Sequence, residues 1–154
     1  MNSKMVGALA AVCLLAACSS ASKNTSAGSG NAGLASTTTN PFGGGGNGDK
    51  VFFDYDQAVI RDDARPTLDG QAAYLAANPT VSVQIAGDCD ERGTEEYNIA
   101  LGSRRANAAE TYLAAKGIPT NRMTTISYGK DRPIDPGSTE EAWAQNRNAI
   151  TSVR

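Results

Sequence analysis

Between residues 49 and 154, apolar side chains follow two spacings, one typical of strands and one typical of helices. Residues 50–55 are rich in β-branched and aromatic side chains and predict a strand, as does the strict alternation along residues 81–85. Between these strands, apolar residues recur every three to four positions over residues 68–76, which predicts a helix. The pair Asn78-Pro79 is expected to end that helix.

The second half of this region continues the alternation of helix and strand. Helical spacing predicts a long helix over residues 95–116, followed by Gly117 where a left-handed residue commonly ends a helix. Residues 123–128 and 148–153 predict two further strands, and residues 138–147 predict a short helix between them.

Two of the predicted helices carry N-terminal capping signals. Asp62 or Asp63 can cap the first, with Pro66 in its first turn, and Ser138 and Glu141 are spaced like a capping box for the third. Strands and helices therefore alternate from one end of the region to the other. This order favours an α+β two-layer sandwich, with helices on one face of a mixed four-stranded sheet, over an all-α or all-β fold.

Residues 1–17 predict a signal peptide, because a positively charged start precedes an apolar run over residues 5–17 that is too short to span a bilayer comfortably. Its end, LAAC, resembles the bacterial lipobox, in which the cysteine, here Cys18, becomes the lipidated first residue of the mature chain. Serine at position 19 implies, by resemblance to lipoprotein sorting rules, the outer membrane. The alternative is an ordinary cleavage site beside an unmodified Cys18.

Residues 19–48 are dominated by Ser, Thr, Asn, Ala and Gly, with four consecutive glycines at 43–46. Such a composition does not bury a core and predicts a flexible chain spanning about 30 Å. We therefore expect a lipidated tether over residues 18–48 and one folded domain over residues 49–154. The alternative for residues 18–48 is a linker without any function.

The amino-acid composition argues against nucleic-acid binding and against catalysis that depends on histidine. Lys and Arg number 14 against 16 Asp and Glu, a net charge of −2, so the basic excess of nucleic-acid-binding proteins is absent and no nucleic-acid partner is expected. The chain has no histidine, which removes the usual base of Ser-His-Asp and Cys-His enzymes. We expect no catalytic residues, cofactor or metal. Cys13 leaves with the signal peptide, so Cys89 is expected to be a buried, unpaired thiol.

The most informative stretch is residues 87–113, GDCDERGTEEYNIALGSRRANAAETYL. It resembles the OmpA-like peptidoglycan-binding domain family, most closely the lipoproteins of the Tol-Pal system, whose loop and helix read GHADERGT and then EYN-x2-LG-x-RRA. Residues 51–56, 127–130 and 146–147 also resemble family strands, so the similarity covers about residues 50–154. It implies a non-enzymatic domain that grips the diaminopimelate of the peptidoglycan stem peptide.

By position, the resemblance implies that Asp90 accepts a hydrogen bond from the ligand ammonium and that Arg105 forks onto a ligand carboxylate. The other expected ligand contacts are Asn98, Leu101, Arg147 and the loop Tyr55, Asp56 and Gln57, the last three mainly through backbone N–H groups. Without the resemblance, Asp90 could simply stabilise its own loop, and Arg105 could pair with Glu91 or Glu110.

The chain departs from the family pattern at three positions: Asp88 replaces a histidine, Cys89 replaces alanine or threonine, and Asn148 replaces the second of two arginines. We expect Asp88 to add negative charge beside Asp90, and the change at Asn148 to weaken carboxylate recognition. Outside the ligand contacts, Arg92 and Arg104 are expected to be a surface or structural pair, and Tyr97 and Tyr112 to lie in the core.

The resemblance also implies partners and location. They are peptidoglycan, outer-membrane lipid through Cys18, and TolB with other Tol-Pal components, for a lipid-anchored domain facing the periplasm in cell division and envelope integrity. Two alternatives stay open: a wall-binding OmpA-like lipoprotein outside the Tol-Pal system, and a thiol or metal enzyme at residues 88–91. The enzyme alternative is the weaker one, because the sequence has no histidine to activate Cys89 and no distant ligands that would complete a metal site.

Overall fold

The computed structural model describes residues 40–42 and 48–154 of the chain. The predicted signal peptide, Cys18 and most of the predicted tether lie outside the described residues. Within the described ranges, no helix combines the length and the hydropathy needed to cross a membrane.

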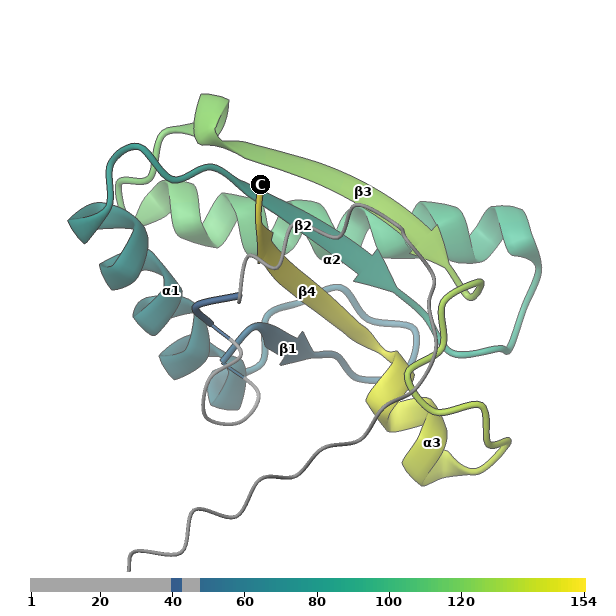
Figure 1. The fold of residues 1–154 in the computed structure, drawn as a ribbon. Helices are drawn as coiled ribbons and strands as arrows, with labels where there is room; N and C mark the ends of the chain where they lie inside the picture. The colour runs from purple at the N-terminus through teal and green to yellow at the C-terminus, as the bar shows by residue number, and fades with distance from the viewer. Residues whose placement is uncertain (1–39, 43–47) are drawn as a thin grey trace, which may run out of the picture. The chain divides into compact units, whose positions relative to one another are not determined.

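One mixed sheet has the strand order β1-β4-β2-β3 (Figure 1). Strand β4 (Asn148–Val153) pairs antiparallel with both β1 (Lys50–Phe52) and β2 (Val83–Asp88), whereas β2 pairs parallel with β3 (Met123–Gly129). A parallel pair needs a long crossover connection, which the second helix supplies. The predicted α+β fold with a mixed four-stranded sheet is confirmed.

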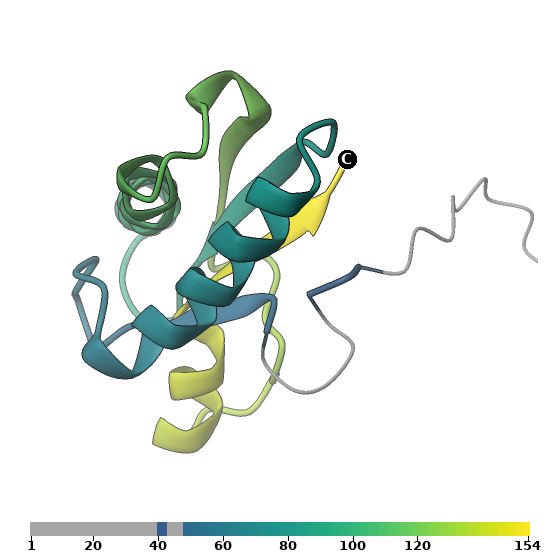
Figure 2. The ribbon, with the colours of Figure 1, turned by 90° about the vertical axis from the view of Figure 1, so that its left-hand side faces the viewer.

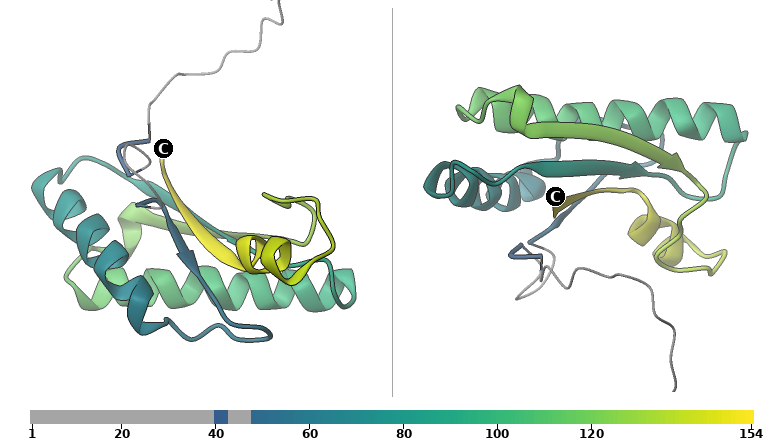
Figure 3. Two further views of the ribbon diagram at one scale, coloured as in Figure 1. Left: turned by 90° about the horizontal axis from the view of Figure 1, so that it is seen from below. Right: turned by 45° about the horizontal axis from the view of Figure 1, so that its top comes forward.

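Helices α1 (Arg65–Ala77) and α2 (Glu95–Ala115) contribute to one core with the sheet, and Figure 2 shows α1 beside α2, which is seen end-on. The short α3 (Glu140–Asn146) leads directly into β4, as the left view of Figure 3 shows. Buried apolar side chains of α1, α2 and one sheet face form the core: Val51, Phe53, Leu68, Leu75, Val83, Ile85, Ala106, Ala109, Leu113, Met123 and Ala149, with Tyr112 packed against them.

The start of α1 differs from its prediction. Asp62–Ala64 form a 3₁₀ turn before the helix, and the carboxylate of Asp63 accepts from Arg61 at 2.8 Å. No side chain caps α1, so the predicted aspartate cap is wrong. The first strand is also shorter than expected and ends at Phe52, because the chain then turns into the loop that leads to α1.

The starts of α2 and α3 are capped by threonines. The Thr94 hydroxyl accepts from the N–H of Tyr97 at 3.2 Å, and the Thr139 hydroxyl accepts from the N–H of Ala142 at 3.3 Å. Each bond satisfies one of the amide groups that a helix start leaves free. The cap of α3 is therefore Thr139, and the predicted cap, Ser138, is wrong.

Two glycines let α2 lie close to β2. A Cβ atom added to Gly102 would lie 2.7 Å from the carbonyl oxygen of Gly87, and one added to Gly87 would lie 3.1 Å from the backbone nitrogen of Ala106 and still closer to the Gly102 carbonyl. Neither position has room for a side chain unless the helix moves. This contact fixes the height of α2 above the end of β2, where polar residues gather.

A residue of the predicted tether belongs to the core. Phe42 is only 8% exposed and packs edge-to-face on Tyr74, with ring centroids 5.1 Å apart. The Asn40 side chain donates to the carbonyl of Thr151 at 3.0 Å, which fastens the same segment to β4. Asn40 and Phe42, which the prediction placed in the tether, therefore both contact the folded domain.

Candidate functional site

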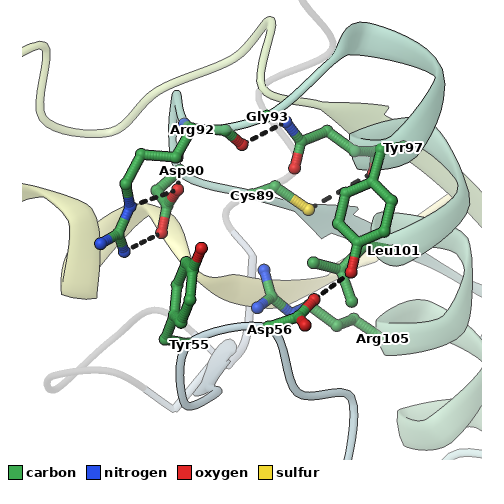
Figure 4. A pocket seen from close by; sticks show the side chains of 10 residues that line it. Tyr55, Asp56, Cys89, Asp90, Arg92, Gly93, Tyr97, Leu101 and Arg105 are labelled. Carbon is green, nitrogen blue, oxygen red and sulfur yellow. Dashed lines mark hydrogen bonds and ion pairs between the residues drawn. The ribbon is translucent and has the colours of Figure 1, made fainter.

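A pocket of about 60 Å³ opens at the end of β2, between the loop after that strand, the first half of α2 and the β1–α1 loop (Figure 4). Its lining residues are Tyr55, Asp56, Cys89, Asp90, Arg92, Gly93, Tyr97, Asn98, Leu101 and Arg105. The fold thus brings together all the predicted ligand residues except Gln57 and Arg147, from three separate segments.

Arg105, near the middle of α2, is 1% exposed and is held by three backbone carbonyls. Its Nε donates to Gln57 at 2.9 Å, its Nη1 to Asp88 at 2.9 Å and its Nη2 to Asp54 at 3.2 Å. One guanidinium therefore joins α2 to the β1–α1 loop and to the end of β2.

Arg105 has no carboxylate at ion-pairing distance among the described residues, so the expected alternative of a pair with Glu91 or Glu110 is wrong. Burial lowers the pKa of Arg105, as expected for a cation removed from water, although a guanidinium stays charged in proteins. Three of its five N–H groups donate to backbone oxygens, which leaves two for another acceptor. A planar pair of donors in a pocket suits a carboxylate.

Asp90, in the loop after β2, is 5% exposed and already paired. Its Oδ2 accepts from Nη2 of Arg92 at 2.6 Å, and its Oδ1 accepts from Nε and from the backbone N–H of Arg92, both at 3.1 Å. Burial by itself raises the pKa of Asp90, but the hydrogen bonds from Arg92 and Arg147 outweigh burial and hold that pKa below its ordinary value. The carboxylate expected to meet a ligand ammonium is therefore occupied by guanidinium groups.

Arg147 lies behind the pocket and does not line it. It is 7% exposed, and its Nη1 is 3.4 Å from Oδ2 of Asp90, while its Nη2 donates to Glu140 at 2.8 Å and its Nε to the Phe53 carbonyl at 3.2 Å. Instead of lining the pocket, Arg147 supports Asp90 from the position between α3 and β4.

Asn98, Leu101 and Cys89 form the inner wall. Asn98 Nδ2 donates to the carbonyl of Arg92 at 2.8 Å, which ties the loop after β2 to α2, and Leu101 is 5% exposed. The Cys89 thiol donates to the carbonyl of Asn98 at 3.4 Å, and burial raises the pKa of this thiol to about 11. The predicted buried cysteine is confirmed, and its thiolate form is scarce at neutral pH.

Tyr55 and Asp56 form an exposed rim. Tyr55 is 60% exposed, and Asp56 has a left-handed backbone with φ of 57° while its carboxylate accepts from the hydroxyl of Tyr97. The N–H of Gln57 donates to the Asp54 carbonyl at 3.1 Å, so this predicted ligand contact is used within the turn. The N–H groups of Tyr55 and Asp56 have no backbone acceptor in the described ranges.

Asp88 and Asn148 are register partners on β2 and β4, and neither lines the pocket. Asp88 is 2% exposed and its Oδ2 accepts from Arg132 at 2.9 Å; burial raises the pKa of Asp88 against the effect of that bond. In the described part of the chain, Oδ1 of each residue is buried without a partner. The Asp88 carboxyl group therefore lies outside the pocket lining, and the expectation that the change at Asn148 weakens carboxylate recognition stays a prediction.

The side chains of residues 88–91 diverge. Asp88 turns to Arg132, Cys89 to the inner wall and Asp90 to Arg92, while Glu91 accepts from the indole of Trp143 at 3.0 Å. Across the ranges that the structure covers, no cluster of three or more Cys, Asp or Glu side chains could hold a metal ion. Nothing here supports a thiol or metal enzyme at these residues.

The positions predicted for Arg92 and Tyr97 were wrong. Arg92 was expected to be a surface or structural residue like Arg104, but it lines the pocket, with its Cζ 4.2 Å from the ring centroid of Tyr55 and 4.1 Å from that of Trp143. Tyr97 was expected in the core, but it is 45% exposed and lies 5.9 Å from Cζ of Arg104. The close spacing of Asp90 and Arg92 in one loop could have indicated that Arg92 pairs with Asp90 at the pocket.

The lowered pKa of Asp90 predicts a pH dependence of stability. A depressed carboxyl pKa contributes stability above the ordinary value of 3.8 and loses it as the pH falls through the folded-state value. The wild type should therefore unfold at a higher temperature than Asp90→Asn at pH 7, and the difference should shrink below pH 3.8 in thermal scans of both proteins. A difference that stays constant with pH would contradict the ionic role of Asp90.

The chain is similar to known proteins over most of its folded domain. Residues 52–147 match the model of the OmpA family. The chain is 53% identical over 104 residues to the peptidoglycan-associated lipoprotein of Brucella melitensis, across 68% of this chain and 62% of that protein, which is less than two thirds of the relative's length. It is 43% identical over 145 residues to the peptidoglycan-associated lipoprotein of Haemophilus influenzae, across 90% of each chain.

Solved structures show the same architecture. The crystal structure of the peptidoglycan-associated lipoprotein from Burkholderia pseudomallei matches 69% of this chain and 90% of that chain, with 39% sequence identity and a TM-score of 0.67. The C-terminal domain of Helicobacter pylori MotB has a TM-score of 0.64 at 21% identity, so it shows the fold alone. The family model and the high identity to these lipoproteins agree, and the chain belongs to the OmpA family.

Proposed function

We infer that this protein binds peptidoglycan noncovalently, through the diaminopimelate of the stem peptide, and has no enzymatic activity. The observation that carries this proposal is Arg105, a buried guanidinium that lines a pocket, has no carboxylate partner among the described residues, and keeps two N–H groups free of backbone oxygens. Diaminopimelate offers a free carboxylate on its side chain, which such a fork can bind with two parallel hydrogen bonds.

The rest of the pocket suits the same ligand. Leu101 offers an apolar floor for the methylene chain, and the exposed ring of Tyr55 and carboxylate of Asp56 stand at the mouth. In this proposal the N–H groups of Tyr55 and Asp56 hold the peptide backbone, while Asn98 acts by fixing the loop that carries Asp90.

The proposal includes a membrane anchor. The lipobox predicts lipidation at Cys18, and the relatives with the matching domain are named lipoproteins. Lipid at one end and a wall-binding domain at the other would join the outer membrane to peptidoglycan, with the domain in the periplasm. More than one acyl chain on Cys18 would make the anchoring stable.

We extend the proposal to TolB as a partner that competes with the wall. Large apolar side chains stand exposed on the β1–α1 loop and the first turn of α2, where Tyr55 is 60%, Val59 71% and Tyr97 45% exposed. Exposed aromatic and apolar side chains of this kind are common in protein interfaces. A protein bound there would cover the mouth of the pocket.

Sedimentation with purified sacculi tests the proposal. The full chain in detergent should sediment with sacculi whose stem peptides contain diaminopimelate, and much less with sacculi that carry lysine at that position, because lysine lacks the side-chain carboxylate. Added TolB should release the protein from the first kind. Equal sedimentation with both walls, or with neither, would sink the assignment of the pocket to diaminopimelate.

A further inference from the structure

Asp88 and Asn148 are two departures from the family pattern that lie outside the pocket lining. They are register partners on the antiparallel strands β2 and β4, so their side chains project side by side from one face of the sheet. Asp88 is 2% exposed and Asn148 is 0% exposed. The two departures therefore meet in one buried place.

The polar atoms of these two side chains are only partly satisfied. Oδ2 of Asp88 accepts from Nη2 of Arg132 at 2.9 Å, and Nδ2 of Asn148 donates to the carbonyl of Gln145 at 2.8 Å. The second bond fixes the orientation of the amide, because the exchanged orientation would place two oxygens against each other. In the part of the chain that the structure describes, Oδ1 of Asp88 and Oδ1 of Asn148 are both buried without a donor.

One hydrogen would satisfy both oxygens. A buried acceptor without a donor is costly, and a carboxylate beside an amide oxygen adds electrostatic repulsion. A protonated carboxyl group has an O–H that donates, so a proton on Oδ1 of Asp88 turns the two acceptors into a donor and an acceptor. A proton needs no cavity, whereas a water molecule needs room and several polar partners.

The surroundings of Asp88 favour its two forms in opposite directions. Burial favours the acid most strongly and raises the pKa of Asp88 above its ordinary value, although Arg132 and Arg105 act against it. Arg132 acts through its bond to Oδ2, but its side chain is 45% exposed, so solvent screens its charge. Arg105 acts by its charge alone, because it donates to the backbone carbonyl of Asp88 and not to the carboxyl group.

The other charged or titratable groups near this place are neutral or bound to other partners. Burial raises the pKa of the Cys89 thiol to about 11, so this thiol is neutral below that pH. The bound groups are Asp90 with Arg92, Glu91 with Trp143, Arg147 with Asp90 and Glu140, Lys130 with the carbonyls of Glu91 and Gly93, and Tyr128 with Arg132. The start of β4 and the end of α3 face Asp88 with the neutral amide of Asn148, which is held by Gln145.

We propose that Asp88 and Asn148 form a proton-binding site, in which Oδ1 of Asp88 carries a hydrogen and donates it to Oδ1 of Asn148, so that a side-chain bond joins β2 to β4. When Asp88 ionises at higher pH, the proton passes to solvent and this bond is lost. The carboxylate then faces an amide oxygen and keeps Arg132 as its partner. The start of β4 is therefore fastened to β2 more firmly at low pH than at high pH, whatever ligand the pocket binds.

Thermal unfolding of the full chain in detergent, at pH 4 and at pH 8, tests the proposal with Asp88→Asn. An amide at position 88 always supplies the donor that the acid supplies only when protonated, and it keeps an oxygen for Arg132. An acid whose pKa is raised on folding stabilises the protein below the ordinary value of 3.8 and loses that contribution as the pH rises through the folded-state value. Asp88→Asn should therefore unfold within about 1 °C of the wild type at pH 4 and about 4 °C above it at pH 8.

Asp131→Asn is the matched control, because it removes one negative charge from an exposed residue of the turn that carries Arg132. Its unfolding temperature should differ from that of the wild type by the same amount at both pH values. Asn148→Asp gives a second measurement should Asp88→Asn fail to fold. Two facing acids share one proton and cannot both ionise cheaply, so its unfolding temperature should fall with pH more steeply than that of the wild type.

Three results would overturn the proposal. If Asp88→Asn unfolds below the wild type at pH 8, the carboxylate is the favoured form, as it would be beside a bound cation or a water that donates to both oxygens. If the difference between Asp88→Asn and the wild type is the same at pH 4 and pH 8, Asp88 does not exchange its proton in this range. An unfolding temperature of Asn148→Asp that falls no more steeply than that of the wild type would show that the two side chains share no proton.

Discussion

Arg105→Ala is expected to lower the free energy of unfolding by roughly 3–5 kcal/mol and to abolish sedimentation with sacculi. The substitution leaves the carbonyls of Asp54, Gln57 and Asp88 without their donor, since each accepts from Arg105 at 2.9–3.2 Å. It also removes the cation assigned to the ligand carboxylate. Stability and binding should therefore fall together, because one side chain both closes the pocket walls and faces the ligand.

Denaturant unfolding and the sacculi assay measure these two effects. Arg105→Lys keeps the charge but not three directed donors, so it should recover part of the stability and little of the binding, since lysine does not fork. Arg104→Ala, in the preceding exposed position of α2, is the matched control and should change stability by no more than about 0.5 kcal/mol. An Arg105→Ala protein that sediments as the wild type does would refute the role of this residue.

Gly87→Ala should destabilise the protein by about 3 kcal/mol and reduce binding, although residue 87 does not line the pocket. The added methyl group would meet the backbone of α2 at Gly102 and at Ala106, whose nitrogen would lie 3.1 Å from it. Backbone atoms cannot turn aside as a flexible side chain can, so α2 must move away from β2. That movement carries Arg105 away from the carbonyl of Asp88.

Gly70→Ala provides the control for this substitution. Gly70 lies inside α1 and a Cβ atom there would meet nothing within 4 Å, so alanine should stabilise the protein by about 0.5–1 kcal/mol through helix propensity. Thermal unfolding of both variants measures the difference. If Gly87→Ala unfolds at the wild-type temperature, the close approach of α2 to β2 does not position the site.

The sequence predicted helices and strands well where the spacing of apolar residues within one element determines its position. Residues 148–153 and the long helix that carries Arg105 were located almost to the residue, because a half-buried strand or an amphipathic helix repeats its pattern locally. The cap of α3 was wrong by one residue, at Thr139 instead of Ser138, because both side chains can accept from a free amide.

The site was less predictable because its contacts join distant segments. The resemblance indicated Asp90 and Arg105, but whether Asp90 is free depends on Arg92, which is held by rings from positions 55 and 143. The composition around Phe42 is that of a linker, and the burial of Phe42 depends on its contact with Tyr74 in α1. Such pairings are set by tertiary packing and have no local repeat.

The point at which the chain joins the fold bears on how the domain carries mechanical load. Asn40 is fastened to Thr151 on β4, whereas the pocket residue Asp90 contacts Arg147 just before that strand, about 13 Å away at 3.3 Å per residue. A pull between these two points runs along β4, which is the inner strand between β1 and β2. The covalent backbone of β4 would then carry the load between the two points, and the noncovalent contacts at its ends, Asn40 with Thr151 and Asp90 with Arg147, would yield first.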